Sequence, residues 1–80
     1  MNQGQDAITL YISKKGGLSF PDSVPIQKEL WNKGADAWYR DNHLEAIVPK
    51  SIEKDVIEHL EGLKNKEKKY KGITYERVSS

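Results

Sequence analysis

The sequence predicts a small, mainly β protein with a short helix, followed by a C-terminal helix and an extended tail. In several stretches before residue 50, apolar and polar residues alternate, as they do in half-buried strands. After residue 50 the apolar residues are spaced three or four apart, which is typical of a helix. With 80 residues and no cysteine, the chain has one thin core at most and no disulfide or cysteine-based zinc site.

The first elements predict a β-hairpin. Residues 8–13 alternate apolar and polar side chains and are rich in β-branched residues, so we expect a strand. Residues 14–17 end in two glycines, which accept positive φ at little cost, and they predict a tight turn. Residues 18–20 alternate again and stop at Pro21, which favours a second, short strand paired with the first.

A short helix is expected next, over residues 26–33. Ser23 has the side chain of an N-cap, and Pro25 would lie in the first turn, where its missing N–H costs little. Gly34 stands where a glycine commonly ends a helix.

A second hairpin is predicted by residues 35–40 and 43–48, which both alternate. Asp41–Asn42 between them is a favourable tight-turn pair, and Pro49 ends the second stretch.

The C-terminal segment predicts a helix that begins at an N-cap Ser51 and ends by Gly72. Its apolar stripe consists of Ile52, Val56, Leu60 and Leu63. Residues 73–78 resemble a strand but have no neighbouring strand to pair with. We therefore interpret the stripe and this stretch as surfaces that await a partner.

The charge is nearly balanced, with 13 basic and 12 acidic residues and a net charge of +1. Any nucleic-acid footprint must therefore come from local clustering. Lys14 and Lys15 at the first hairpin tip are candidates. The lysine-rich run 64–71 is interpreted as a solvated helix end, with nucleic-acid contact as the alternative.

No set of residues predicts catalysis. His43 and His59 are the two histidines, they lack metal-ligand spacing, and no phosphate-binding glycine loop is present. We expect a non-enzyme without metal or cofactor. The absence of a long apolar run predicts no membrane association and a cytoplasmic location.

The stretch 12–21, with its strand, basic residues, glycines, short strand and proline, resembles the first hairpin of AbrB/MazE-type swapped-hairpin domains. Residues 34–42 and 44–49 resemble the remainder. The resemblance covers about residues 7–50 and implies that two chains interleave their hairpins into a barrel-like homodimer that binds operator DNA. Residues 1–6 are then expected to be a disordered N-terminus.

The same resemblance implies an antitoxin of the MazE/PemI type in a type II toxin–antitoxin system. Its segment 51–80 would bind and inhibit a MazF/PemK-type endoribonuclease. Two alternatives remain open: an AbrB-like transcriptional regulator without a toxin partner, and a small phage- or plasmid-borne interaction protein.

This hypothesis assigns two sets of residues. The expected DNA contacts are Lys14, Lys15, Lys28, Lys33 and Arg40. The expected toxin contacts are Ile52, Val56, Leu60, Leu63, Tyr70, Ile73 and Tyr75. A truncation at Glu61 would then keep dimerisation and DNA binding but lose toxin neutralisation.

Overall fold

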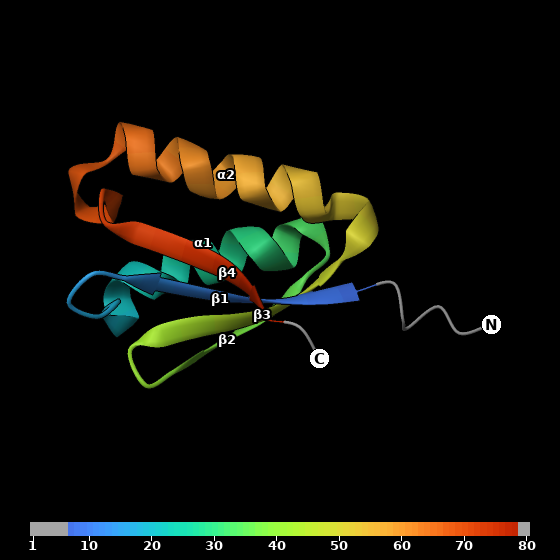
Figure 1. The fold of residues 1–80 in the computed structure, drawn as a ribbon, viewed down its shortest axis with the longest axis horizontal. Coiled ribbons are helices and arrows are strands. Elements are labelled where there is room, and N and C mark those ends of the chain that lie inside the picture. The colour runs from blue at the N-terminus through green and yellow to red at the C-terminus, as the bar shows by residue number, and fades with distance from the viewer. Residues whose placement is uncertain (1–6, 79–80) are drawn as a thin grey trace.

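The computed structural model describes residues 7–78; residues 1–6, which were expected to be disordered, and residues 79–80 lie outside the described residues. Four strands and two helices follow one another along this part of the chain (Figure 1). They are β1 (Ala7–Lys14), α1 (Phe20–Lys33), β2 (Asp36–Arg40), β3 (His43–Pro49), α2 (Glu53–Lys66) and β4 (Ile73–Val78). Short 3-10 helices, η2 (Lys50–Ile52) and η3 (Lys68–Tyr70), flank α2.

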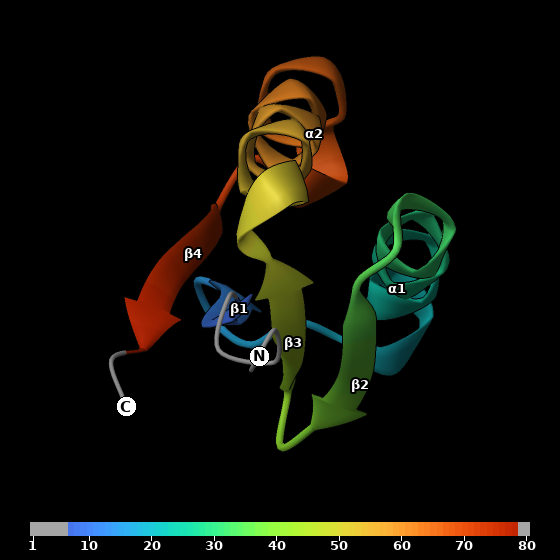
Figure 2. The same ribbon diagram turned by 90° about the vertical axis from the view of Figure 1, so that its right-hand side faces the viewer.

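The strands form one antiparallel sheet in the order β2-β3-β1-β4. This is the split β-α-β arrangement, in which each helix connects two strands that have a third strand between them. Figure 2 shows both helices on the same side of the sheet. The opposite side carries no helix of the described chain, and we call it the open face.

One hydrophobic core lies between the sheet and the helices. Its buried residues include Leu10, Ile12, Leu18, Ile26, Leu30, Leu44, Val48, Val56, Leu60, Tyr70 and Ile73. Side chains from 7–50 and from 51–78 are therefore packed together in a single core. The segment after residue 50 completes the fold that the preceding residues begin.

The expected first hairpin is wrong. Leu18 is buried but belongs to no strand, and α1 begins at Phe20. The reason lies in the helix start: the Ser19 hydroxyl accepts a hydrogen bond from the Asp22 backbone N–H at 3.4 Å. Pro21 then occupies the first turn, where it favours a helix over a strand.

The helix is therefore longer at its start than the sequence predicted. Ser23 is not the N-cap but a fully buried residue of α1, and its hydroxyl donates to the Phe20 carbonyl oxygen at 2.7 Å. Pro25 lies inside the helix. The predicted end is confirmed, because Gly34 adopts a left-handed conformation with φ of 102°. Its N–H donates to the carbonyl oxygens of Leu30 and Trp31 in the last turn of the helix.

The second hairpin is confirmed. β2 and β3 pair in register, and Asp41 and Asn42 between them have φ of 49° and 66°. Two successive residues with positive φ match the right-handed twist of a two-residue hairpin, and aspartate and asparagine tolerate that region.

The C-terminal helix and the strand after it are confirmed, with two corrections. Ser51 lies in η2 and does not cap α2, whose N-cap Ile52 has no side-chain capping bond; the helix ends at Lys66, before Gly72. β4 does have a partner, because it pairs with β1 along its whole length. The class is thus α/β, with a four-stranded antiparallel sheet and two helices.

Candidate nucleic-acid interface

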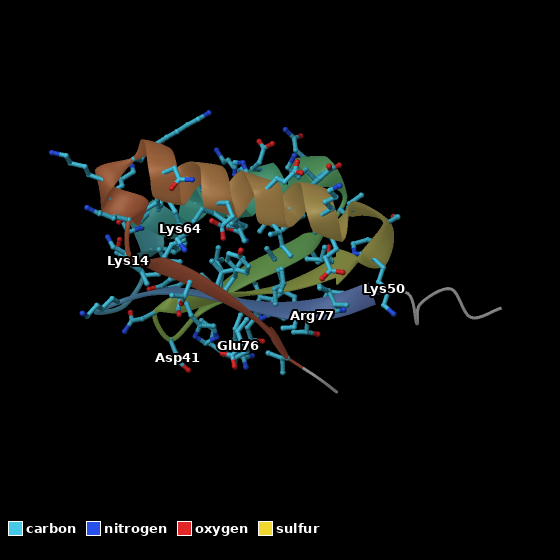
Figure 3. The ribbon with its side chains drawn as sticks, turned by 45° about the horizontal axis from the view of Figure 1, so that its top comes forward. Lys14, Asp41, Lys50, Lys64, Glu76 and Arg77 are labelled. Carbon is cyan, nitrogen blue, oxygen red and sulfur yellow. The ribbon has the colours of Figure 1, made fainter. Side chains whose placement is uncertain are left out.

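Lysine side chains gather at the end of the molecule where β1 ends and β4 begins. Figure 3 shows Lys14 and Lys64 there, at the opposite end from Lys50 and Arg77. We call this cluster the basic end; its members are Lys14, Lys15, Lys64, Lys66, Lys68, Lys69 and Lys71. These are seven of the chain's 13 basic residues.

Two distant segments meet at the basic end because β1 and β4 are neighbours in the sheet. Lys14 lies opposite Ile73 in the β1–β4 register. One residue further, the Lys15 N–H donates to the Gly72 carbonyl oxygen at 3.2 Å. The loop after β1 is thereby held beside the lysine-rich chain that leads from α2 to β4.

The basic end carries few compensating carboxylates. Lys14 Nζ lies 3.9 Å from Asp22 Oδ2, and both side chains are about a quarter exposed. Glu67 lines a surface pocket of about 310 Å³ together with Lys64, Asn65, Lys66, Lys68 and Lys71. Lys64 and Lys66 in the last turn of α2 also face the negative end of the helix dipole.

A buried tyrosine anchors this end to the rest of the fold. Tyr70 is 1% exposed, and its hydroxyl donates to the Asp22 carbonyl oxygen in α1 at 2.8 Å. Burial raises the pKa of Tyr70 above its ordinary value. Lys69 Nζ lies 5.3 Å from the centre of the Tyr70 ring. The lysines of η3 are therefore fixed in place by a residue that is itself in the core.

The other predicted DNA contacts lie elsewhere. Lys28 is exposed on α1. Lys33 Nζ is 3.6 Å from Glu29 Oε2 on the same helix. Arg40 Nη1 is 3.9 Å from Glu45 Oε2 on the open face. The fold thus places Lys14 and Lys15 beside the lysines of 64–71. The other three predicted contacts, Lys28, Lys33 and Arg40, do not belong to the basic end.

The predicted toxin contacts lie in or against the core. Val56, Leu60, Tyr70 and Ile73 are buried, and Ile52, Leu63 and Tyr75 pack against the same cluster. The expectation that these side chains lack a partner in the chain itself is therefore wrong. The reason is that β4 pairs with β1, which places α2 over the sheet beside α1.

The open face has a different composition. It carries Thr9, Tyr11, Ser13, Asp36, Trp38, Arg40, His43, Glu45, Ile47, Thr74, Glu76 and Val78, which alternate along the strands with the core residues. Tyr11, Ile47 and Val78 are 38%, 41% and 40% exposed. Acidic side chains outnumber basic ones among these residues, in contrast to the basic end.

The centre of the open face is an organised cluster. The Tyr11 and His43 rings stack with centroids 4.4 Å apart, and His43 Nε2 lies 3.1 Å from Glu45 Oε2. The hydrogen bond from His43 lowers the pKa of Glu45, although desolvation opposes the shift. The hydrogen bond with Glu45 raises the pKa of Tyr11.

Two groups of residues were assigned only in part from the sequence. The run 64–71 was interpreted as a solvated helix end, with nucleic-acid contact as the alternative, although its lysine density is a local signal. The open-face residues gave no local signal, because the register of four strands decides which of them become neighbours.

No family model, curated protein or solved structure matches this chain. Across residues 7–78 no group of three or more metal-ligating side chains comes together. Neither helix of the described fold is long and apolar enough to cross a membrane.

Proposed function

We propose that this chain is a nucleic-acid-binding protein that contacts the phosphate backbone of duplex DNA with its basic end. The observation that carries the proposal is the meeting of Lys14 and Lys15 with the lysines of 64–71. A nearly neutral chain thereby gathers seven lysines at one end, where the carboxylates of Asp22 and Glu67 lie beside them.

Lysine ammonium groups suit this role. They act as point charges toward phosphates and release condensed counterions from the duplex, which makes binding salt-dependent but largely independent of sequence. The lysines come from a loop, a helix end and a 3-10 helix. Such an arrangement can follow a backbone without any base contact, so we expect positioning contacts rather than sequence readout.

The test is a fluorescence anisotropy titration of a random-sequence DNA duplex with the full chain at several salt concentrations. The test variant replaces Lys14, Lys15, Lys68 and Lys69 by glutamine. Each phosphate contact contributes about 0.9 to the slope of log K against log salt, so we expect the slope to fall by about three to four. We also expect an affinity loss of more than about tenfold at low salt.

A matched variant replaces four lysines outside the basic end, Lys28, Lys33, Lys50 and Lys54, by glutamine. It changes the net charge equally, and it also tests the earlier assignment of Lys28 and Lys33. A third variant carries arginine at the four basic-end positions and should retain binding. Equal losses in the two glutamine variants, with circular dichroism showing both folded, would contradict the proposal.

The resemblance to AbrB/MazE-type domains extends this proposal to an antitoxin that acts in the cytoplasm. It adds a homodimer, operator repression and inhibition of a MazF/PemK-type ribonuclease. The existence of a second, chemically different surface on the open face favours a protein partner. An antitoxin should rescue cells from a coexpressed MazF-type toxin. Its basic-end glutamine variant should still rescue them but lose repression, whereas an AbrB-like regulator would give no rescue in either form.

A further inference from the structure

The strand register places aromatic and carboxylate side chains alternately across the open face. Trp38 on β2 lies opposite Glu45 on β3, Glu45 lies opposite Tyr11 on β1, and Tyr11 lies opposite Glu76 on β4. We call Trp38, Glu45, Tyr11 and Glu76 the central row. All four strands contribute one residue each, and neighbouring members are a strand spacing of about 4.8 Å apart.

The central row is chemically matched to the arginine side chain. A guanidinium group is planar, so it stacks on an aromatic ring while its fork of N–H groups donates to a carboxylate. Alternation at the strand spacing places a carboxylate on each side of the Tyr11 ring. His43 stacks on one face of the Tyr11 ring, and Tyr11 is 38% exposed, so an incoming guanidinium would stack on the other ring face.

The two carboxylates of the central row, Glu45 and Glu76, differ in the contacts that they already make within the chain. Glu45 accepts from His43, and Arg40 Nη1 lies 3.9 Å away; its side chain is 14% exposed. Glu76 is exposed and makes no ion pair or side-chain hydrogen bond within residues 7–78. Glu76 is therefore the carboxylate that an incoming cation would meet at least cost.

The charge of the open face selects among possible occupants. Asp36, Glu45 and Glu76 face outward with Arg40 as the one basic side chain of this face in the described sheet. A phosphate backbone would be repelled here. A second copy placed face to face would bring like charges together. A polypeptide that presents cations is complementary to the face.

We propose that the open face binds an arginine-bearing segment of a partner protein, with guanidinium groups stacked on Tyr11 and paired with Glu76. Beside the central row, Ile47 and Val78 flank the half-buried Thr9, and these two exposed apolar side chains would cover the segment's aliphatic stems. This inference does not depend on DNA binding at the basic end, so each can fail alone.

The probe is a synthetic peptide of alternating arginine and serine, titrated into the isotope-labelled full chain at low ionic strength and followed by amide NMR shifts. We expect the largest shifts on β1, β3 and β4 around Tyr11 and Glu76. A peptide with lysine in place of arginine has the same charge but no planar group. It should bind at least about twofold more weakly.

Two variants test the residues. Glu76→Gln should weaken the affinity for the arginine peptide by about two- to fivefold, which is the range expected for the loss of an exposed ion pair. Tyr11→Leu keeps an apolar side chain but removes the ring, and we expect a similar loss. Glu58→Gln, which changes an exposed carboxylate on α2, is the matched control and should leave the affinity unchanged.

Three outcomes would overturn the inference. The first is equal binding of the arginine and lysine peptides. The second is an equal effect of Glu76→Gln and Glu58→Gln. The third is a set of shifts on the open face with a thymidine oligonucleotide but not with the peptide, which would make nucleic acid the occupant. None of these outcomes affects the slope of log K against log salt for DNA binding, which tests the basic end.

Discussion

The basic end and the open face are two polar surfaces of the same small fold, yet they are built in opposite ways. The basic end takes most of its lysines from one run, 64–71, and needs the fold only to add Lys14 and Lys15. The open face takes single residues from four strands that are distant in sequence. Their charges also differ in sign.

This difference explains why the overall charge says little about the molecule. The net charge of +1 is the balance between a basic end and the remainder of the surface, which is richer in carboxylates. The two proposals together predict that one chain contacts a polyanion at the basic end and a cationic partner at the open face.

The largest effect is expected from truncation after Glu61. It removes Tyr70, Ile73 and all of β4, and each of the two buried side chains contributes about 1.5–3 kcal/mol. Because a small domain is stable by about 5–15 kcal/mol in total, we expect the truncated chain to be unfolded and both surfaces to be lost. Circular dichroism during thermal unfolding should show no cooperative transition.

A chain that ends at Val78 is the control for this truncation and should unfold like the full chain. A folded Glu61 truncation that still bound DNA would instead support the two-part organisation expected from the sequence. In that organisation, residues 7–50 form a domain of their own.

Much of the fold could be predicted locally. The alternation in 8–13, 35–40 and 43–48 identified three strands, and Gly34 and Asp41–Asn42 marked a helix end and a turn. These signals depend on neighbouring residues. The strand over 73–78 was also recognisable, but its pairing with β1 was not, because nothing near it in sequence specifies a partner.

The errors share one physical cause. Residues 18–20 alternate like a strand, yet the Ser19 cap and Pro21 begin a helix there, and the buried position of Leu18 is compatible with either. Likewise the stripe through Val56 and Leu60 was correctly predicted to be helical. It was expected to bind a toxin, but it packs in the core of the chain itself. Periodicity indicates which face is apolar, but not which surface covers it.

A smaller effect is expected from Tyr70→Phe, which acts beneath the basic end. The change keeps the ring in the core and removes the hydroxyl that donates to the Asp22 carbonyl oxygen. A hydrogen bond of this kind contributes about 0.5–1.5 kcal/mol, and urea unfolding should show a loss in that range. The charges remain, so the salt slope of DNA binding should not change.

Tyr11→Phe is the counterpart on the open face. Tyr11 is 38% exposed, so water can take the place of Glu45 beside its hydroxyl and the loss should be smaller. Equal losses in the two variants would mean that the basic end is no more firmly anchored than the open face.

The smallest expected effect is a change in the pH dependence of stability with Glu45→Gln. The His43 hydrogen bond holds the pKa of Glu45 below its ordinary value, so the unfolded chain takes up this proton at a higher pH than the folded chain does. The contribution to stability is complete above the unfolded pKa of about 4.3 and is lost as the pH falls through the folded pKa. Urea midpoints should therefore decrease less on acidification in Glu45→Gln than in the unchanged chain.

Glu58→Gln is again the matched control for this change, because Glu58 is exposed on α2 and outside the cluster of the open face. His59, whose pKa is lowered chiefly by burial, also destabilises the fold as the pH falls, since the folded protein resists its protonation. His59 is present in both variants, so its effect cancels in their difference. If Glu45→Gln and Glu58→Gln followed the same curve from about pH 6 to pH 3, the hydrogen bond between His43 and Glu45 would contribute no measurable pH-dependent stability.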